Sequence, residues 1–196
     1  MTMQRTSIRA GDTIENRLTG ETVHFLRTAA DTDGELVEIE VTVEPDGAVA
    51  AAHVHPFQSE RFEVLDGTLE FREGRARIVA DPGDVVTVPA GQVHSFRNVG
   101  ETTARFRCEV RPALQFERFL ETMFGLAADG KTNGRGMPSP LRLAVIAKAH
   151  FDDVRLPHVP AFAQKAALAA GAAVGRLFGF GPTYEPRREL EAAYVS

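Results

Sequence analysis

Hydrophobic and polar side chains alternate along most of the first 111 residues, and this pattern predicts β-strands. The clearest run covers residues 35–43, where Val37, Ile39 and Val41 alternate with acidic or hydroxyl side chains. One apolar and one polar face is typical of an antiparallel sheet with one side in water. Shorter runs, separated by turn residues, lie at residues 22–27, 60–65, 68–73, 75–80, 84–88 and 102–111. Many short strands with turns between them predict a sandwich or small barrel.

After Pro112 the spacing of apolar residues changes from about 2 to about 3.6, which predicts helices. Glu117, Arg118 and Glu121 lie opposite an apolar stripe that consists of Phe116, Phe119, Leu120, Met123, Phe124 and Ala127. We expect this helix to cover the barrel or to pair with another subunit.

The rest of the chain continues the helical pattern. Residues 129–140 are rich in glycine and proline, which favours a helix connector over a lid at the barrel mouth. Further helices are predicted within residues 141–151 and 160–180, where Gly171 and Gly175 allow close helix contact. We therefore expect an N-terminal arm at residues 1–20, a β-barrel at residues 21–111, and a helical extension at residues 112–196 that packs on the barrel or on a dimer partner.

Composition excludes several classes of partner. The chain has 22 basic and 27 acidic residues, and this balance does not favour nucleic-acid binding. Charged and polar residues, among them Lys165 and Arg176, interrupt the apolar segment at residues 160–180, so we expect no membrane span. Cys108 is the single cysteine and the first 20 residues lack the apolar region of a signal peptide, which together predict a cytoplasmic protein.

Two histidine-bearing segments carry the candidate chemistry. His53 and His55 are two residues apart, so on a strand both imidazoles leave the same face, with Cα atoms roughly 6.5–7 Å apart. Glu60 begins an otherwise apolar strand face, where a carboxylate is costly to bury without a positive partner. A turn at residues 89–91 then places His94 at the start of the next strand. Three imidazoles and one carboxylate suit a first-row transition metal and leave coordination positions open.

The spacing within these segments resembles both sequence motifs of the cupin superfamily. The first runs from Gly47 through His53, His55 and Glu60 to Gly67, and the second consists of Gly83, Pro89, Gly91, His94 and Asn98. The resemblance covers about residues 20–111. It implies a mainly β, jelly-roll barrel with one divalent metal (Fe, Mn, Ni, Co, Cu or Zn) held by His53, His55, Glu60 and His94.

Alternate side chains of a strand point to opposite faces, and this alternation predicts an apolar cavity around the metal. The inward-facing residues expected to line or floor it are Phe62, Phe71, Phe96, Phe106 and Cys108. Phe57 lies on the turn between two ligands, at the cavity mouth or simply exposed. Gln58 and Gln92 are the nearest uncharged polar side chains, and they either orient a substrate or water or lie at the surface.

The resemblance also implies a function. The protein is similar to mononuclear dioxygenases of the cupin superfamily that act on small apolar or aromatic molecules, with Glu60 as the candidate base. Isomerase or cyclase chemistry at the same site is an alternative, and a barrel that binds a small molecule or metal without turnover is another. We further expect a homodimer.

Overall fold

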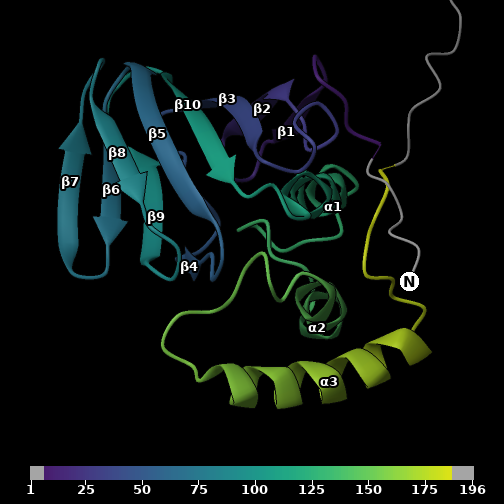
Figure 1. Cartoon of the computed structure of the whole chain (residues 1–196). Coiled ribbons are helices and arrows are strands. Elements are labelled where there is room, and N and C mark those ends of the chain that lie inside the picture. The colour runs from purple at the N-terminus through teal and green to yellow at the C-terminus, as the bar shows by residue number, and fades with distance from the viewer. Residues whose placement is uncertain (1–6, 187–196) are drawn as a thin grey trace, which may run out of the picture.

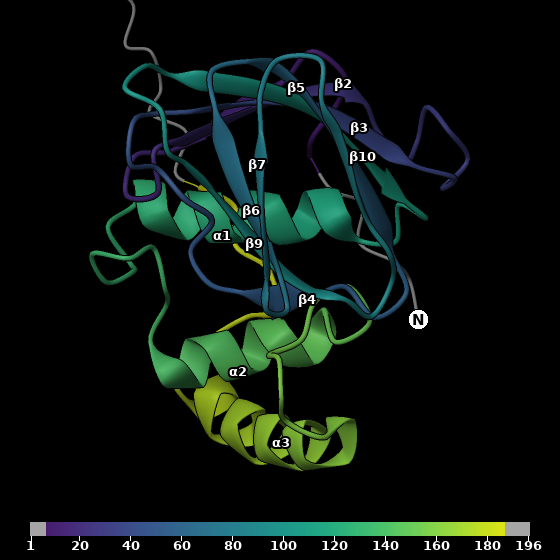
Figure 2. The ribbon, with the colours of Figure 1, turned by 90° about the vertical axis from the view of Figure 1, so that its left-hand side faces the viewer.

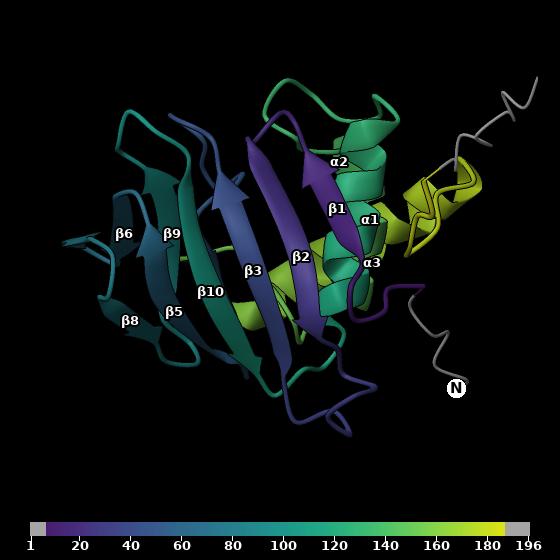
Figure 3. The same ribbon diagram turned by 90° about the horizontal axis from the view of Figure 1, so that it is seen from above.

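The computed structural model describes residues 7–186 and contains two antiparallel β-sheets followed by helices (Figure 1). One sheet has six strands in the order β1-β2-β3-β10-β5-β8, and the other has four in the order β4-β9-β6-β7. Figure 3 shows the six strands side by side with β1 at one edge. The strands are β1 (Thr13–Asn16), β2 (Glu21–Arg27), β3 (Val37–Val43), β4 (His53–Val54), β5 (Ser59–Asp66), β6 (Leu69–Glu73), β7 (Ala76–Ala80), β8 (Val85–Val88), β9 (Val93–Asn98) and β10 (Ala104–Arg111). The predicted jelly-roll class is confirmed.

Alternating burial along the strands builds the core between the two sheets. In β3 and β10 every second side chain is buried. Four aromatic rings from both sheets meet there, with neighbouring centroids 5.0–6.3 Å apart: Phe62, Phe71, Phe96 and Phe106. Asn98 has a structural role, because its amide donates to the main-chain oxygens of Val43 and Thr102, both at 2.8 Å.

The segment predicted to be an extended arm contains an additional edge strand. Residues 13–16 form β1, which pairs with β2 so that Asn16 lies opposite Glu21. The alternation in β1 is too short to stand out, because only Asn16 of its four residues is buried. Residues 1–6 of the expected arm and 187–196 of the expected extension lie outside the described residues.

Three helices follow the sheets in chain order: α1 (Phe116–Ala128), α2 (Pro140–Ala149) and α3 (Ala161–Leu177). They are arranged so that α1 lies next to the sheets, α2 below it and α3 farthest away (Figures 1 and 2). Both Glu117 and Glu121, on the face opposite the apolar stripe of α1, are buried as well. The Ala29 N–H donates to Glu117 (2.6 Å) and the Ser7 hydroxyl donates to Glu121.

The two glycines of the last helix permit the close helix contact expected from the sequence. A Cβ atom at Gly175 would lie 2.6 Å from the main-chain oxygen of Leu141, and one at Gly171 would lie 2.8 Å from the Cβ of Ala144. Helices α2 and α3 therefore pack backbone to backbone at this point. Among the described residues, no helix combines the length and apolar character needed to cross a bilayer.

Candidate metal centre

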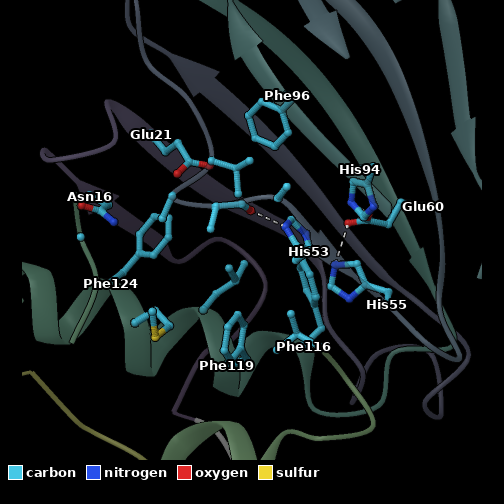
Figure 4. A pocket seen from close by; sticks show the side chains of 18 of the residues that line it. Asn16, Glu21, His53, His55, Glu60, His94, Phe96, Phe116, Phe119 and Phe124 are labelled. Atoms are coloured by element: carbon cyan, nitrogen blue, oxygen red, sulfur yellow. Dashed lines mark hydrogen bonds and ion pairs between the residues drawn. The ribbon is translucent and has the colours of Figure 1, made fainter. Parts of the chain in front are cut away.

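Four side chains from separate segments converge at one end of the jelly roll. His53 on β4 lies opposite His94 on β9, His55 follows β4, and Glu60 lies on β5. One candidate ligand atom from each of the four lies within 4.8 Å of the others. The rings and the carboxylate point toward a common centre in Figure 4. The structure thus brings together the four residues predicted as metal ligands.

Main-chain carbonyls orient all three imidazoles. The Nδ1 atoms of His53, His55 and His94 lie 2.9, 2.6 and 3.2 Å from the oxygens of Ala51, Asp153 and Gln92, respectively. A carbonyl only accepts, so each Nδ1 carries the hydrogen and donates it. The Nε2 lone pair of each ring is then left free for a metal ion, an arrangement typical of metal-binding histidines.

The electrostatics of the cluster favour a neutral His53 and an ionised Glu60, which are the forms that bind a cation. Protein surrounds the His53 ring, and this loss of solvation, with the nearby His55 and His94, lowers its pKa to about 3. Burial alone would raise the pKa of Glu60, but the neighbouring histidines outweigh it and hold the pKa at about 2. Burial opposes ionisation of His94 too, yet contact with Glu60 raises its pKa above 6.5.

The carboxylate shows why these residues fit a metal ion. His94 Nε2 lies 2.6 Å from Glu60 Oε2 and His55 Nε2 lies 3.7 Å from Glu60 Oε1. A neutral His94 has its hydrogen on Nδ1, so its Nε2 atom donates nothing to the buried Oε2 atom, and no other group among the described residues does so. An ionised carboxylate buried in this way is costly unless a cation meets it. A divalent first-row metal would satisfy the oxygen and the three Nε2 atoms together.

The helical extension takes part in building the centre. Val54 and Arg155 form a two-way main-chain bridge, with N···O distances of 3.0 and 2.9 Å, and this bridge brings Asp153 against His55. The Asp153 carboxylate accepts the Gln115 N–H at 2.7 Å and lies 3.3 Å from His150 Nδ1. A segment 98 residues away in sequence therefore orients a ligand. Nothing in the local sequence of residues 150–155 indicates this role.

A largely apolar cavity of about 230 Å³ adjoins the cluster. The strands supply one wall, which includes Val23, Val41 and Phe106. The apolar stripe of α1 supplies another, with Phe116, Phe119, Leu120, Met123 and Phe124. Figure 4 shows Phe116, Phe119 and Phe124 directed from α1 toward the cavity. The helix thus closes one side of the barrel interior.

Comparison with known proteins agrees with this architecture. Residues 39–110 match the family described as the cupin domain. This part of the chain is a cupin domain. Over 107 residues it is 33% identical to quercetin 2,3-dioxygenase from Bacillus subtilis (strain 168), a match that covers 54% of this chain and 31% of that relative. The cupin protein thus aligns with under a third of the relative's length.

Several solved structures resemble the cupin protein. KdgF from a Halomonas species is 15% identical, with a TM-score of 0.48, over 54% of this chain and 92% of that chain. A predicted oxalate decarboxylase from Thermotoga maritima is 20% identical, with a TM-score of 0.47, over 55% and 99% of the two chains. A protein with a double-stranded β-helix domain from Klebsiella pneumoniae is 27% identical, with a TM-score of 0.39, over 41% and 70%.

The structure of the cupin protein separates the expected pocket residues into two groups. Four of them line the cavity: Phe62, Phe96, Phe106 and Cys108. Burial raises the pKa of the Cys108 thiol well above 9.0, so this side chain is a neutral part of the wall. Phe71 also points inward but lies behind Phe62 and Phe96, so it supports the wall without reaching the cavity.

The other three expected pocket residues lie elsewhere. Gln58 is buried, but its amide donates to the main-chain oxygens of Pro112 and Ala113, both at 3.0 Å, so it joins the barrel to the extension. Phe57 is 56% exposed, because its turn projects outward. Gln92 lies beside Gly74 on the loop before β9, and only its carbonyl, bonded to His94, serves the centre. None of these three lines the cavity of the cupin domain.

Sequence reasoning missed four polar residues that line the cavity: Asn16, Glu21, Arg155 and Gln164. Asn16 and Glu21 both line the cavity, on β1 and β2. The signal that could have indicated Glu21 is its parity, because it shares the inward face of β2 with Val23 and Phe25. A glutamate on that face is as unusual as Glu60 on β5.

Proposed function

We propose that this protein is a metal-dependent enzyme of dioxygenase type that acts on a small, largely apolar or aromatic molecule. The observation that carries the proposal is the buried cluster of three histidines and one glutamate at one end of an apolar cavity. The similarity to a quercetin 2,3-dioxygenase over 107 residues supports it. When bound, a divalent metal would supply Lewis acidity and open positions for a substrate oxygen or for O₂.

The residues of this chain would hold the metal, exclude water and align the substrate. His53, His55 and His94 would hold the metal through Nε2, with their rings fixed by the carbonyl hydrogen bonds. The apolar walls from β3, β10 and α1 would exclude water and align a flat or elongated substrate. At this end of the cavity, the polar contacts of a substrate would be the open side of the cluster and Arg155.

Glu60 is the residue best placed to accept a proton. It is ionised at neutral pH, and its Oε2 atom lacks an aligned donor. An enol or phenol hydroxyl that reaches this oxygen can donate its proton to the carboxylate. The low pKa also suits a metal ligand, so Glu60 acts as a base only where it is held loosely.

Oxygen consumption provides the test. Protein loaded separately with Fe, Mn, Ni, Co, Cu and Zn is offered quercetin and, in parallel, a small β-diketone, and O₂ uptake is recorded. We expect uptake with at least one redox-active metal and its loss in Glu60→Gln and in His94→Ala. No uptake with any metal, although both compounds bind, would contradict the enzyme proposal and favour a binding protein without turnover.

The scarcity of polar groups on the cavity wall supports that second candidate. A binder would hold the same compounds with one metal ion and release them unchanged. Isomerisation, with zinc as effective as iron or manganese, would identify the non-redox alternative. A homodimer and a cytoplasmic location remain predictions from the sequence.

A further inference from the structure

The cavity has a second polar end that the metal centre does not use. Asn16 and Glu21 are direct neighbours across the β1–β2 pair, and both line the cavity. In Figure 4 they lie on the opposite side of the cavity from the three histidines, with Phe96, Phe119 and Phe124 in the space between. Apart from these two residues and the cluster, most of the lining is apolar, with Arg155 and Gln164 of the helical extension as the polar exceptions.

The strand register gives the separation of the two ends. From β2, which carries Glu21, the sheet passes through β3 and β10 to β5, which carries Glu60, so the two backbones are about 14 Å apart across the strands. Glu21 pairs with Val43 of β3, and Val43 pairs with Ala104 of β10. Glu60 instead pairs with Val110, at the other end of β10. This adds roughly 20 Å along the strands in a flat sheet. Twist and curvature shorten both values, yet the groups remain at opposite corners.

Glu21 is buried without a cation to balance it. Only 8% of its surface is exposed. Burial raises the pKa of its carboxyl from 4.5 to about 7, and the Thr19 hydroxyl offsets only part of this effect. A lysine or arginine in contact would instead have lowered the pKa. A buried carboxyl that faces a cavity without such a partner can form further hydrogen bonds with a ligand in that cavity.

Asn16 offers the complementary group. The Leu18 N–H donates to Asn16 Oδ1 at 3.2 Å, which identifies the other end of the amide as the NH₂ group. That NH₂ group is covered by the loop between α1 and α2, because a Cβ atom at Gly136 would lie 3.4 Å from Nδ2. Gly136 and Met137 of this loop also line the cavity. The loop, expected from the sequence to be a connector, therefore encloses the distal end.

We infer that Glu21 and Asn16 form a second recognition site, which binds a hydroxyl group at the far end of an elongated apolar ligand whose other end lies at the metal centre. The hydroxyl would donate to the Glu21 carboxyl and accept from the Asn16 NH₂ group. One small polar group that both donates and accepts matches this pair. The inference deepens the proposed function, since it rests on a ligand that occupies the same cavity.

Binding of alkyl hydroxamates to the zinc-loaded protein tests the inference. These compounds chelate a metal at one end, and a series of increasing chain length is prepared with either a terminal methyl or a terminal hydroxyl group. A well-matched hydroxyl should bind about tenfold tighter or more than the methyl compound of equal length, as for a hydrogen bond to a charged or buried group. The preference should appear only above a minimum length, when the chain reaches Glu21.

The matched variants are Glu21→Leu, Asn16→Ala and, as a control, Glu15→Gln. Glu15 precedes Asn16 on β1 and is exposed, with its carboxylate paired to Arg17 at 3.1 Å. Glu21→Leu should abolish the hydroxyl preference while the methyl compound binds at least as well, which also shows that the variant is folded. Asn16→Ala should reduce the preference, and Glu15→Gln should leave it unchanged.

The outcomes separate this inference from the proposed function. Hydroxamate binding requires no O₂ chemistry, so a preference that depends on Glu21 supports the second site even if no flavonol or diketone is oxidised. Equal affinity for both compounds at every length, or a preference that survives Glu21→Leu, would overturn it. Failure of every hydroxamate to bind would also count against it, because the inference requires a ligand that spans the cavity.

Discussion

His55 Nδ1 lies 2.6 Å from the main-chain oxygen of Asp153, so a residue of the helical extension orients a predicted metal ligand of the jelly roll. The Asp153 side chain in turn accepts the Gln115 N–H just before α1. The extension therefore completes the centre, and changes within it should alter metal affinity without changing any ligand.

Replacing Asp153 tests this relationship. In Asp153→Ala the bonds to Gln115 and His150 are lost, the segment moves more freely, and the His55 ring is less well oriented. Metal affinity should fall by about 10- to 100-fold, the usual effect of a partner behind a ligand. Titration against a competing chelator measures it. Asp152→Ala is the control, because the Asp152 side chain is 71% exposed, and an equal loss in that variant would argue against the specific role of Asp153.

Removing a ligand should have a larger effect. His53→Ala and His94→Ala should each lose most of the bound metal in elemental analysis, with circular dichroism still that of a β-rich fold. His24→Ala is the matched control, since His24 is bonded to Thr13 (3.0 Å) on the outer face of β2. Full metal content in the His53 and His94 variants would refute the assignment of the site.

The buried carboxyl of Glu21 should make stability depend on pH. Its pKa is higher in the folded protein than in the unfolded chain, so the folded state holds the proton more tightly, and the associated stability is complete below about pH 4.5 and is lost as pH rises through about 7. A shift from 4.5 to about 7 corresponds to at most about 3 kcal/mol. The Glu21→Gln variant cannot ionise and should not show this loss.

The comparison is made by urea unfolding of both proteins between pH 4 and pH 9. Subtracting the variant from the wild type cancels groups that the two proteins share, including the histidines of the metal centre. The free energy of unfolding of the variant relative to the wild type should increase with pH, and Glu15→Gln should show no such trend. A difference that stays constant with pH would contradict the buried, unpaired state of Glu21.

Gly175 should be intolerant of the smallest side chain. Alanine is favoured over glycine in a helix by about 1 kcal/mol, so propensity alone predicts that Gly175→Ala stabilises the protein. Its Cβ, however, would lie 2.6 Å from the Leu141 oxygen, so α3 would have to move away from α2. We expect a lower melting temperature despite the better propensity. A rise in melting temperature would mean that the two helices are packed less closely than described.

Local sequence was sufficient for the barrel. Residues that alternate in β3 and β10 have every second side chain buried, and the wider motif spacing identified His53, His55, Glu60 and His94, which the fold brings together. Parity also identified Phe62, Phe96, Phe106 and Cys108 as inward-facing. These successes have one cause: the period of a strand is fixed by its backbone geometry, so the face of each residue can be read without knowing its partners.

Where the alternation of side chains along a strand gave no guide, the sequence left the side-chain positions open. Phe57, Gln58 and Gln92 are close to ligands in sequence but lie on turns, whose side-chain directions depend on the local backbone and on the surface that covers them. Glu117 and Glu121 were placed opposite the apolar stripe, and both are buried because α1 also contacts the segments around Ala29 and Ser7. The spacing of apolar residues in this helix does not indicate either contact.

By itself, the sequence determined most of the strands, the helices and the four residues of the candidate metal site, because periodicity and motif spacing are local properties of the chain. Only the tertiary structure decided that α1 closes the cavity, that Asp153 orients His55, and that Asn16 and Glu21 form a second polar end. Each of these features depends on packing between segments that are far apart in the sequence. The spacing of residues along the chain does not indicate which distant segments will be in contact.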